Sequence, residues 1–81
     1  MSRNEIVKRV TGIVAREANV TLENMDLSTR LESIDIDSLD MIKVAGAIEK
    51  DFNVTIVTTE LLQMNTFGDI VTGLETKLAL N

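Results

Sequence analysis

A serine stands among carboxylates in the segment Asp35-Ile36-Asp37-Ser38-Leu39-Asp40, just before a run of residues with helical periodicity. Its hydroxyl could act as a nucleophile or could accept a covalent modification. The chain contains no His, Cys, Trp or Tyr, so it lacks the common proton shuttle and the thiol nucleophile. A serine hydrolase needs a base and an oxyanion hole, and no His supplies the base here. The residue types therefore favour a serine that is modified rather than activated.

The carboxylates beside Ser38 do not complete another familiar type of site. Asp35 and Asp37 begin like a calcium-binding loop, but its sixth and twelfth positions, which require Gly and Glu, hold Asp40 and Gly46. Aspartate-based phosphotransferases place a similar pair in a much larger α/β domain. The plainest interpretation is that Asp37 caps a helix and Ser38 is an ordinary first-turn residue. Taken alone, the tripeptide Asp-Ser-Leu favours that interpretation.

Negative charge is concentrated around Ser38. The net charge of the 81 residues is −5, and residues 20–42 alone carry −5, against +2 for residues 1–19 and −2 for residues 43–81. Such a surface repels nucleic acid and attracts partners with basic docking surfaces. A DNA-reading helix would also need to be basic. We therefore expect protein partners and no nucleic acid.

Length and composition predict one domain over residues 1–81. The chain has no Pro, no low-complexity run and no internal repeat, so no linker is evident. No apolar run approaches the roughly 20 residues that span a bilayer, and no signal peptide is evident. We expect a cytoplasmic protein without stable membrane insertion.

The spacing of apolar and capping residues predicts an all-α fold with three main helices, one short helix and a long first loop. Ser2 and Glu5 have capping-box spacing ahead of an amphipathic helix that runs to about Ala18, where Asn19 suits a left-handed C-cap. Residues 19–36 break this period and predict a loop held to the core by apolar side chains, namely those of Val20, Leu22, Met25, Leu27 and Leu31. A loop of that length tends to be functional.

The second helix should begin at Asp37 or Ser38, with Asp37 and Asp40 as its cap, and end near Asn53. At 100° per residue, a broad apolar arc of this helix contains Leu39, Ile42, Val44, Ala45, Gly46, Ile48 and Phe52. Gly46 would either allow close helix packing or enlarge an internal cavity.

The remaining chain predicts two further helices. Residues 54–57 are β-prone but lack a partner strand, so we expect a loop there. Thr58 or Thr59 could cap a short helix that runs through Gln63. Thr66 and Asp69 repeat the capping spacing at the start of a last amphipathic helix.

Taken in order, these elements resemble the acyl carrier protein family over essentially the whole chain. The resemblance is carried by Asp37-Ser38-Leu39-Asp40, by Ala47-Ile48-Glu49-Lys50-Asp51-Phe52, which is similar to the family's Ala-Leu-Glu-x-x-Phe, and by Thr66-Phe67-Gly68-Asp69. It implies a small four-helix bundle that is a non-catalytic carrier. It implies that a phosphopantetheinyl transferase moves 4′-phosphopantetheine from coenzyme A to Ser38. Acyl groups would then travel as thioesters on this arm in fatty acid, other lipid or polyketide-type biosynthesis.

The resemblance also implies roles for the neighbours of Ser38. Asp37 would serve both capping and transferase recognition, and Asp35 and Asp40 would belong to an acidic docking surface for acyl-transferring and chain-elongating enzymes. Leu39 and Ile42 would make the hydrophobic contact beside the arm.

Two of the departures from the family pattern change the charge of the chain. Asp35 stands where the family often has Gly, and Lys43 stands where it often has Glu on the docking face. A change of two charge units at Lys43 alters steering and partner choice, so we expect a specialised rather than a housekeeping carrier.

Two alternatives remain open at this point. An aminoacyl or peptidyl carrier would share the attachment motif, although such domains usually lie within longer chains. A small acidic bundle could instead bind another protein through its second helix with Ser38 unmodified, and its binding would survive Ser38→Ala. For the acyl carrier we expect a monomer.

Overall fold

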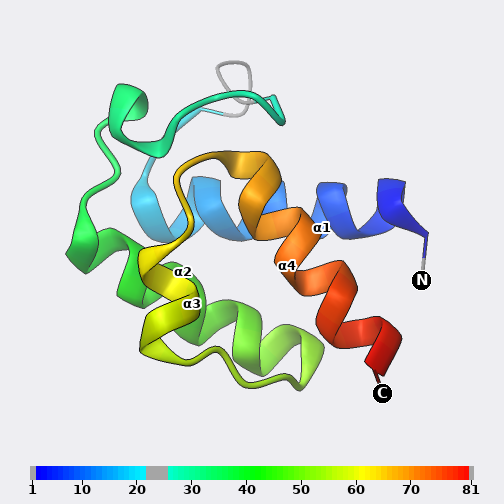
Figure 1. Ribbon diagram of the computed structural model, residues 1–81. Helices are drawn as coiled ribbons and strands as arrows, with labels where there is room; N and C mark the ends of the chain where they lie inside the picture. Colours follow the sequence, from blue (N-terminus) through cyan, green and yellow to red (C-terminus); the bar gives the residue numbers. More distant parts are fainter. Residues whose placement is uncertain (1, 22–25, 81) are drawn as a thin grey trace.

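The computed structural model describes residues 2–21 and 26–80. Within them the chain folds into four α-helices and one 3₁₀ turn, without a β-strand, and this confirms the all-α prediction of three main helices and one short helix (Figure 1). In chain order the elements are α1 (Arg3–Ala18), η2 (Leu31–Ile34), α2 (Ser38–Phe52), α3 (Thr58–Leu62) and α4 (Phe67–Leu80).

Local capping chemistry sets both ends of α1 and α2. The Ser2 hydroxyl accepts a hydrogen bond from the backbone N–H of Glu5 at 3.2 Å. Asn19 and Asn53 close the two helices in the left-handed region, with φ of 56° and 55°. Asn tolerates this conformation better than most residues, because its short polar side chain bonds locally. The predicted bounds of both helices are confirmed.

The start of α3 differs from the prediction. Val57, rather than Thr58 or Thr59, is the N-cap residue, and Thr58 is the first helical residue. The carboxylate of Glu60 accepts a hydrogen bond from the backbone N–H of Val57 at 2.9 Å. A carboxylate from within the first turn thus satisfies the N–H of the N-cap residue itself, whereas the Val57 side chain offers no acceptor to the N–H groups of the first turn.

The predicted long loop is only partly irregular, because residues 31–34 form the 3₁₀ turn η2. Main-chain hydrogen bonds tie the loop to the start of α4: Leu31 N–H donates to Asn65 at 2.9 Å, and Phe67 N–H donates to Thr29 at 2.9 Å. Leu31 is buried and Val20 packs against the core, whereas Leu27 is 40% exposed. The predictions for Leu22 and Met25 lie outside the described residues.

The core lies where α1 crosses α2 and α4 (Figure 1). The most deeply buried large side chains, each less than 2% exposed, are those of Phe67, Ile48, Ile70, Val10, Val14, Val44 and Val71. The helices α1, α2 and α4 each bury one apolar face here, α3 packs beside α2, and the first loop is hydrogen-bonded to the start of α4.

The broad apolar arc predicted for α2 is divided by this packing. Val44, Ala45, Ile48 and Phe52 are buried, but Leu39 is 69% exposed and Ile42 58% exposed. A Cβ built on Gly46 would meet nothing within 4 Å. Gly46 therefore neither allows close helix packing nor enlarges an internal cavity, so both predicted roles are wrong, and Gly46 faces open space on the surface.

Candidate functional site

Ser38 is the first residue of α2, and its side chain is exposed. A complete capping box holds this turn: the Asp37 carboxylate accepts from the N–H of Asp40 at 2.9 Å, and the Asp40 carboxylate accepts from the N–H of Asp37 at 3.3 Å. The hydroxyl of Ser38 forms no hydrogen bond with the part of the chain that the structure describes. A rigid helix start thus presents an available hydroxyl to solvent.

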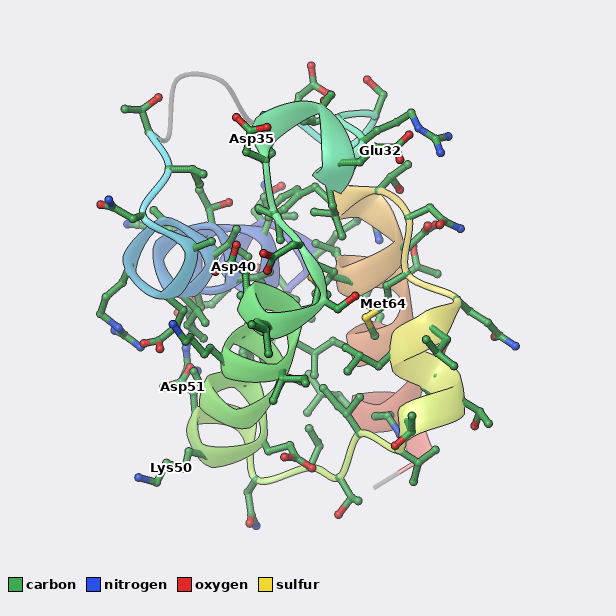
Figure 2. The ribbon with its side chains drawn as sticks, turned by 90° about the vertical axis from the view of Figure 1, so that its left-hand side faces the viewer. Glu32, Asp35, Asp40, Lys50, Asp51 and Met64 are labelled. Atoms are coloured by element: carbon green, nitrogen blue, oxygen red, sulfur yellow. The ribbon has the colours of Figure 1, made fainter. Side chains whose placement is uncertain are left out.

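A largely apolar groove of about 340 Å³ begins beside Ser38 and runs between α2 and α3. Its apolar lining consists of Leu31, Ile36, Met41, Ile42, Leu61, Leu62 and Met64. Figure 2 shows Met64 between α2 and α3. The groove is therefore built from three segments that are distant in the sequence, η2, α2 and the α3 region.

The predicted acidic residues gather at the same end of α2. Figure 2 shows Glu32 and Asp35 on the loop above the helix, with Asp40 below them in its first turn. Asp35 closes η2 with φ of 60° and ψ of 31°, a left-handed conformation in which Gly is the least strained residue. This conformation explains why the family often has Gly at the position of Asp35. Asp also tolerates the left-handed conformation, so Asp35 can replace Gly there.

The remaining predicted partner residues separate in space. Ile42 lines the groove beside Ser38, whereas Leu39 is exposed outside that lining. Lys43 faces a different groove, between α1 and α2, together with Gly46 and Lys50. The structure thus brings Asp37 and Ile42 to the groove of Ser38 and places Lys43 on another surface.

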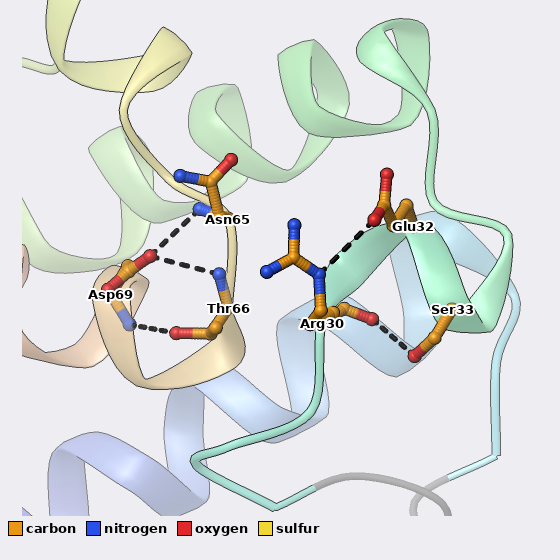
Figure 3. A network of polar contacts seen from close by, with 6 residues as sticks. All are labelled: Arg30, Glu32, Ser33, Asn65, Thr66 and Asp69. Carbon is orange, nitrogen blue, oxygen red and sulfur yellow. Dashed lines mark hydrogen bonds and ion pairs between the residues drawn. The ribbon is translucent and has the colours of Figure 1, made fainter.

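A polar network fixes the wall of the groove opposite α2 (Figure 3). Asp69 accepts from the backbone N–H of Asn65 at 2.9 Å and of Thr66 at 3.0 Å, and these hydrogen bonds hold the pKa of the Asp69 carboxyl below its ordinary value. Arg30 and Asn65 both line the groove. The backbone of Arg30 pairs with that of Thr66, the neighbour of Asn65, in an isolated antiparallel bridge. These contacts join the loop before η2 to the start of α4 at the edge of the groove.

A second polar contact holds α3 against α4. The ammonium of Lys77 lies 2.7 Å from the carboxylate of Glu60, and this hydrogen bond, together with that from the N–H of Val57, lowers the pKa of Glu60. This contact joins the five-residue helix α3, which lines the groove beside Ser38, to α4.

Sequence reasoning missed the lining residues from the α3 region, Leu61, Leu62 and Met64. The available signal was the adjacent apolar pair Leu61-Leu62 in so short a helix, which cannot turn both side chains toward the core. In the structure Leu62 is 76% exposed.

The described residues offer neither a cluster of metal ligands nor a membrane-spanning helix. No group of three or more His, Cys, Asp or Glu side chains is placed to hold a metal ion among residues 2–21 and 26–80. Across the same residues, every helix is too short or too polar to cross a membrane.

The comparison with family models decides the assignment. A model described as a phosphopantetheine attachment site matches residues 8–74. The chain belongs to this family. Its groove fits such a group, because an available hydroxyl stands at the rim of an apolar cleft. The chain is therefore a non-catalytic carrier of the acyl carrier protein type, with 4′-phosphopantetheine as its prosthetic group.

Curated relatives and a solved structure agree with this assignment. The acyl carrier protein of Streptococcus thermophilus (strain CNRZ 1066) is 35% identical over 72 residues, which cover 89% of this chain and 95% of that protein. The acyl carrier protein of Thermotoga maritima is 31% identical over 78 residues, covering 95% and 96%. A crystal structure of an acyl carrier protein from Thermotoga maritima superposes with a TM-score of 0.86 at 22% identity, over 98% of this chain and 93% of that chain. This last likeness confirms the fold.

Proposed function

We propose that Ser38 is the attachment residue and that the chain, as one domain over residues 1–81, carries acyl groups in fatty acid, other lipid or polyketide-type biosynthesis. The prosthetic group supplies the thiol to which acyl groups are bound as thioesters. Partner enzymes would meet the carrier as a monomer in the cytoplasm. Each of these statements is finer than membership of the family and needs its own support.

The observation that carries the proposal is the contrast between Ser38 and the other serines. The hydroxyl of Ser2 caps α1, that of Ser28 donates to the Asp26 carboxylate at 2.7 Å, and that of Ser33 donates to the carbonyl of Arg30 at 2.6 Å. Ser38 makes no such bond within the described chain, is exposed, and stands at the rim of the apolar groove. Its hydroxyl is thus the one whose modification breaks no existing contact.

Position at the start of α2 supports the same choice. A phosphodiester on Ser38 would place its negative charge at the positive end of the helix dipole, which stabilises it by about 0.3–1 kcal/mol when exposed. The carboxylates of Asp35 and Asp37 oppose that charge, so we assign them to recognition by the transferase and by basic docking patches.

The groove supports the carriage of apolar cargo. Burial of each methylene group gains about 0.8 kcal/mol, so even a short stretch of acyl chain in the groove is protected from water. Ile42, at the mouth of the groove and 58% exposed, would contact the arm, and Leu39 would extend this apolar surface toward a partner.

Modification of the purified protein tests the proposal. The protein is incubated with coenzyme A, magnesium and a broad-specificity phosphopantetheinyl transferase, and its intact mass is recorded. Wild type and Ser33→Ala should each gain one phosphopantetheinyl group, whereas Ser38→Ala should gain none. A folded wild-type protein that gains nothing would overturn the proposal and would favour an unmodified interaction module, whose binding survives Ser38→Ala.

A specialised role is supported by Lys43, an exposed cation on the helix where carriers of this family often have Glu. Reversal of this charge by Lys43→Glu should raise turnover of the loaded carrier by enzymes of standard fatty acid synthesis. No gain in turnover would remove this part of the proposal.

A further inference from the structure

The surface of α2 changes sign along the helix. Asp40 lies in the first turn, whereas Lys43 and Lys50 project farther along, seven residues apart and so on nearly the same face. At 1.5 Å of rise per residue the two lysines are about 10 Å apart along the axis. Figure 2 shows Lys50 at the far end of α2 from Asp35 and Glu32.

The other carboxylates of α2 are already engaged. Glu49 accepts from the backbone N–H of Ile56 at 2.9 Å, and Asp51 forms an ion pair with Arg9 at 2.8 Å. Neither Lys43 nor Lys50 forms an ion pair within the described residues. Glu49 keeps its negative charge but is half-buried beside Ile56. Beyond the first turn, the exposed charges of α2 that have no ion-pair partner within the described residues are therefore those of Lys43 and Lys50.

Both lysines border an open groove of about 670 Å³ between α1 and α2. Gly46 and Ala47 lie between them, and the space above Gly46 is empty for at least 4 Å around a Cβ position. The other charged groups that line the groove are held in ion pairs, Arg16 with Glu17 at 3.0 Å and Asp51 with Arg9 at 2.8 Å. Neither carboxylate of the groove therefore forms an ion pair with Lys43 or Lys50. Side chains of a partner can thus reach the two ammonium groups without a steric barrier.

We propose that this Lys43–Lys50 groove docks a carboxylate-bearing surface of a partner protein. The partner would meet α2 with two signs of charge, basic opposite Asp35 and Asp40 and acidic opposite the two lysines. An enzyme with a uniformly basic docking patch would be repelled by the second half of the helix. This inference deepens the proposed function, because it concerns the partners of the same carrier, but it does not depend on modification of Ser38.

A peptide probe tests the inference on the full chain. The probe is a helical peptide with two Glu residues spaced as Lys43 and Lys50 are, and its match carries Lys at both places. Backbone amide shifts of the ¹⁵N-labelled protein are followed at low salt. The acidic probe should shift amides of the groove, chiefly those of Arg16, Lys43, Gly46, Ala47 and Lys50. Added salt should weaken this binding, because the charges are exposed.

Charge reversal supplies the control. The double variant Lys43→Glu/Lys50→Glu should bind the acidic probe about tenfold more weakly and should bind the basic probe better, since each exposed ion pair contributes about 0.2–1 kcal/mol and reversal turns attraction into repulsion. Lys8→Glu, an exposed lysine of α1 outside the groove, should leave the affinity unchanged. All of these residues are exposed, so the variants keep the fold, as thermal unfolding would verify.

Three results would overturn the inference: equal binding of the acidic probe by the double variant, no amide shifts at low salt, or shifts that depend on protein concentration without any probe. The last would mean that a second copy of the chain supplies the carboxylates. Ser38→Ala should bind the probe like wild type, although it loses the mass gain described above. Failure of the groove and failure of the attachment site are therefore separate outcomes.

Discussion

Replacement of Asp37 distinguishes its capping role from its recognition role. Asp37→Ala removes the hydrogen bond from the Asp40 N–H, at 2.9 Å, while the reciprocal bond from the backbone N–H of residue 37 to the Asp40 carboxylate, at 3.3 Å, remains possible. One exposed cap contact is lost. We therefore expect the free energy of unfolding to fall by about 1 kcal/mol. For a domain of this size that corresponds to a decrease in Tm of about 4–8 °C.

Two variants serve as matched controls. Asp37→Asn keeps an oxygen that can accept the hydrogen bond but removes the charge, so its Tm should stay near that of wild type. Thr66→Ala removes the equivalent cap of α4, where the Thr66 hydroxyl accepts from the N–H of Asp69 at 3.1 Å, and its Tm should fall about as far as that of Asp37→Ala. Thermal unfolding by circular dichroism measures all three.

The rate of modification then separates the roles. If transferase recognition uses the Asp37 charge, both Asp37 variants should be modified more slowly, by up to about fivefold for one exposed ion pair, and Thr66→Ala should react at the wild-type rate. Intact mass against time at a temperature where every variant is folded gives the rates. Asp37→Asn modified as fast as wild type would refute the recognition role, and Thr66→Ala slowed as much as Asp37→Ala would show that stability controls the rate.

Further predictions concern stability. Gly46→Ala should raise the free energy of unfolding by about 1 kcal/mol in denaturant titrations, because Ala is the better helix former and the new Cβ meets nothing within 4 Å. Gly68→Ala should lower it by about 1–3 kcal/mol in the same titrations, since its Cβ would lie 2.7 Å from the carbonyl oxygen of Leu27. Stability should fall as pH drops below about 4, because hydrogen bonds hold the folded-state pKa of Asp69 below its ordinary 3.8; the unfolded chain binds that proton first. Asp69→Asn should weaken this pH dependence, and an unchanged profile would contradict the assignment.

The ends of α1, α2 and α4 were predictable because their signals are local. Ser2, Asp37 and Thr66 each act on a backbone N–H within three residues, and Asn19 adopts its left-handed conformation without help from distant segments. The family was predictable for the same reason, since its motifs lie at these helix starts. Ser38 stood out from its immediate neighbours alone.

Other features depended on contacts between segments distant in the chain. The turn η2 forms where Leu31 bonds to Asn65, and nothing in the sequence near Leu31 names that partner. The start of α3 was predicted too late because Thr58 and Thr59 are good capping types. In the structure Val57 is the N-cap residue, and the Glu60 carboxylate accepts a hydrogen bond from its N–H.

The sequence by itself determined the bounds of α1 and α2, the start of α4, the acidic surroundings of Ser38 and the family. Tertiary structure alone decided which part of the apolar arc of α2 is covered. Leu39 and Ile42 are exposed, and a groove opens between α2 and the short helix α3 beside Ser38. Gly46 lies on the surface between Lys43 and Lys50, on the side of α2 where α1 packs. Periodicity gives the direction of each side chain around its own helix axis, but burial depends on where neighbouring helices end.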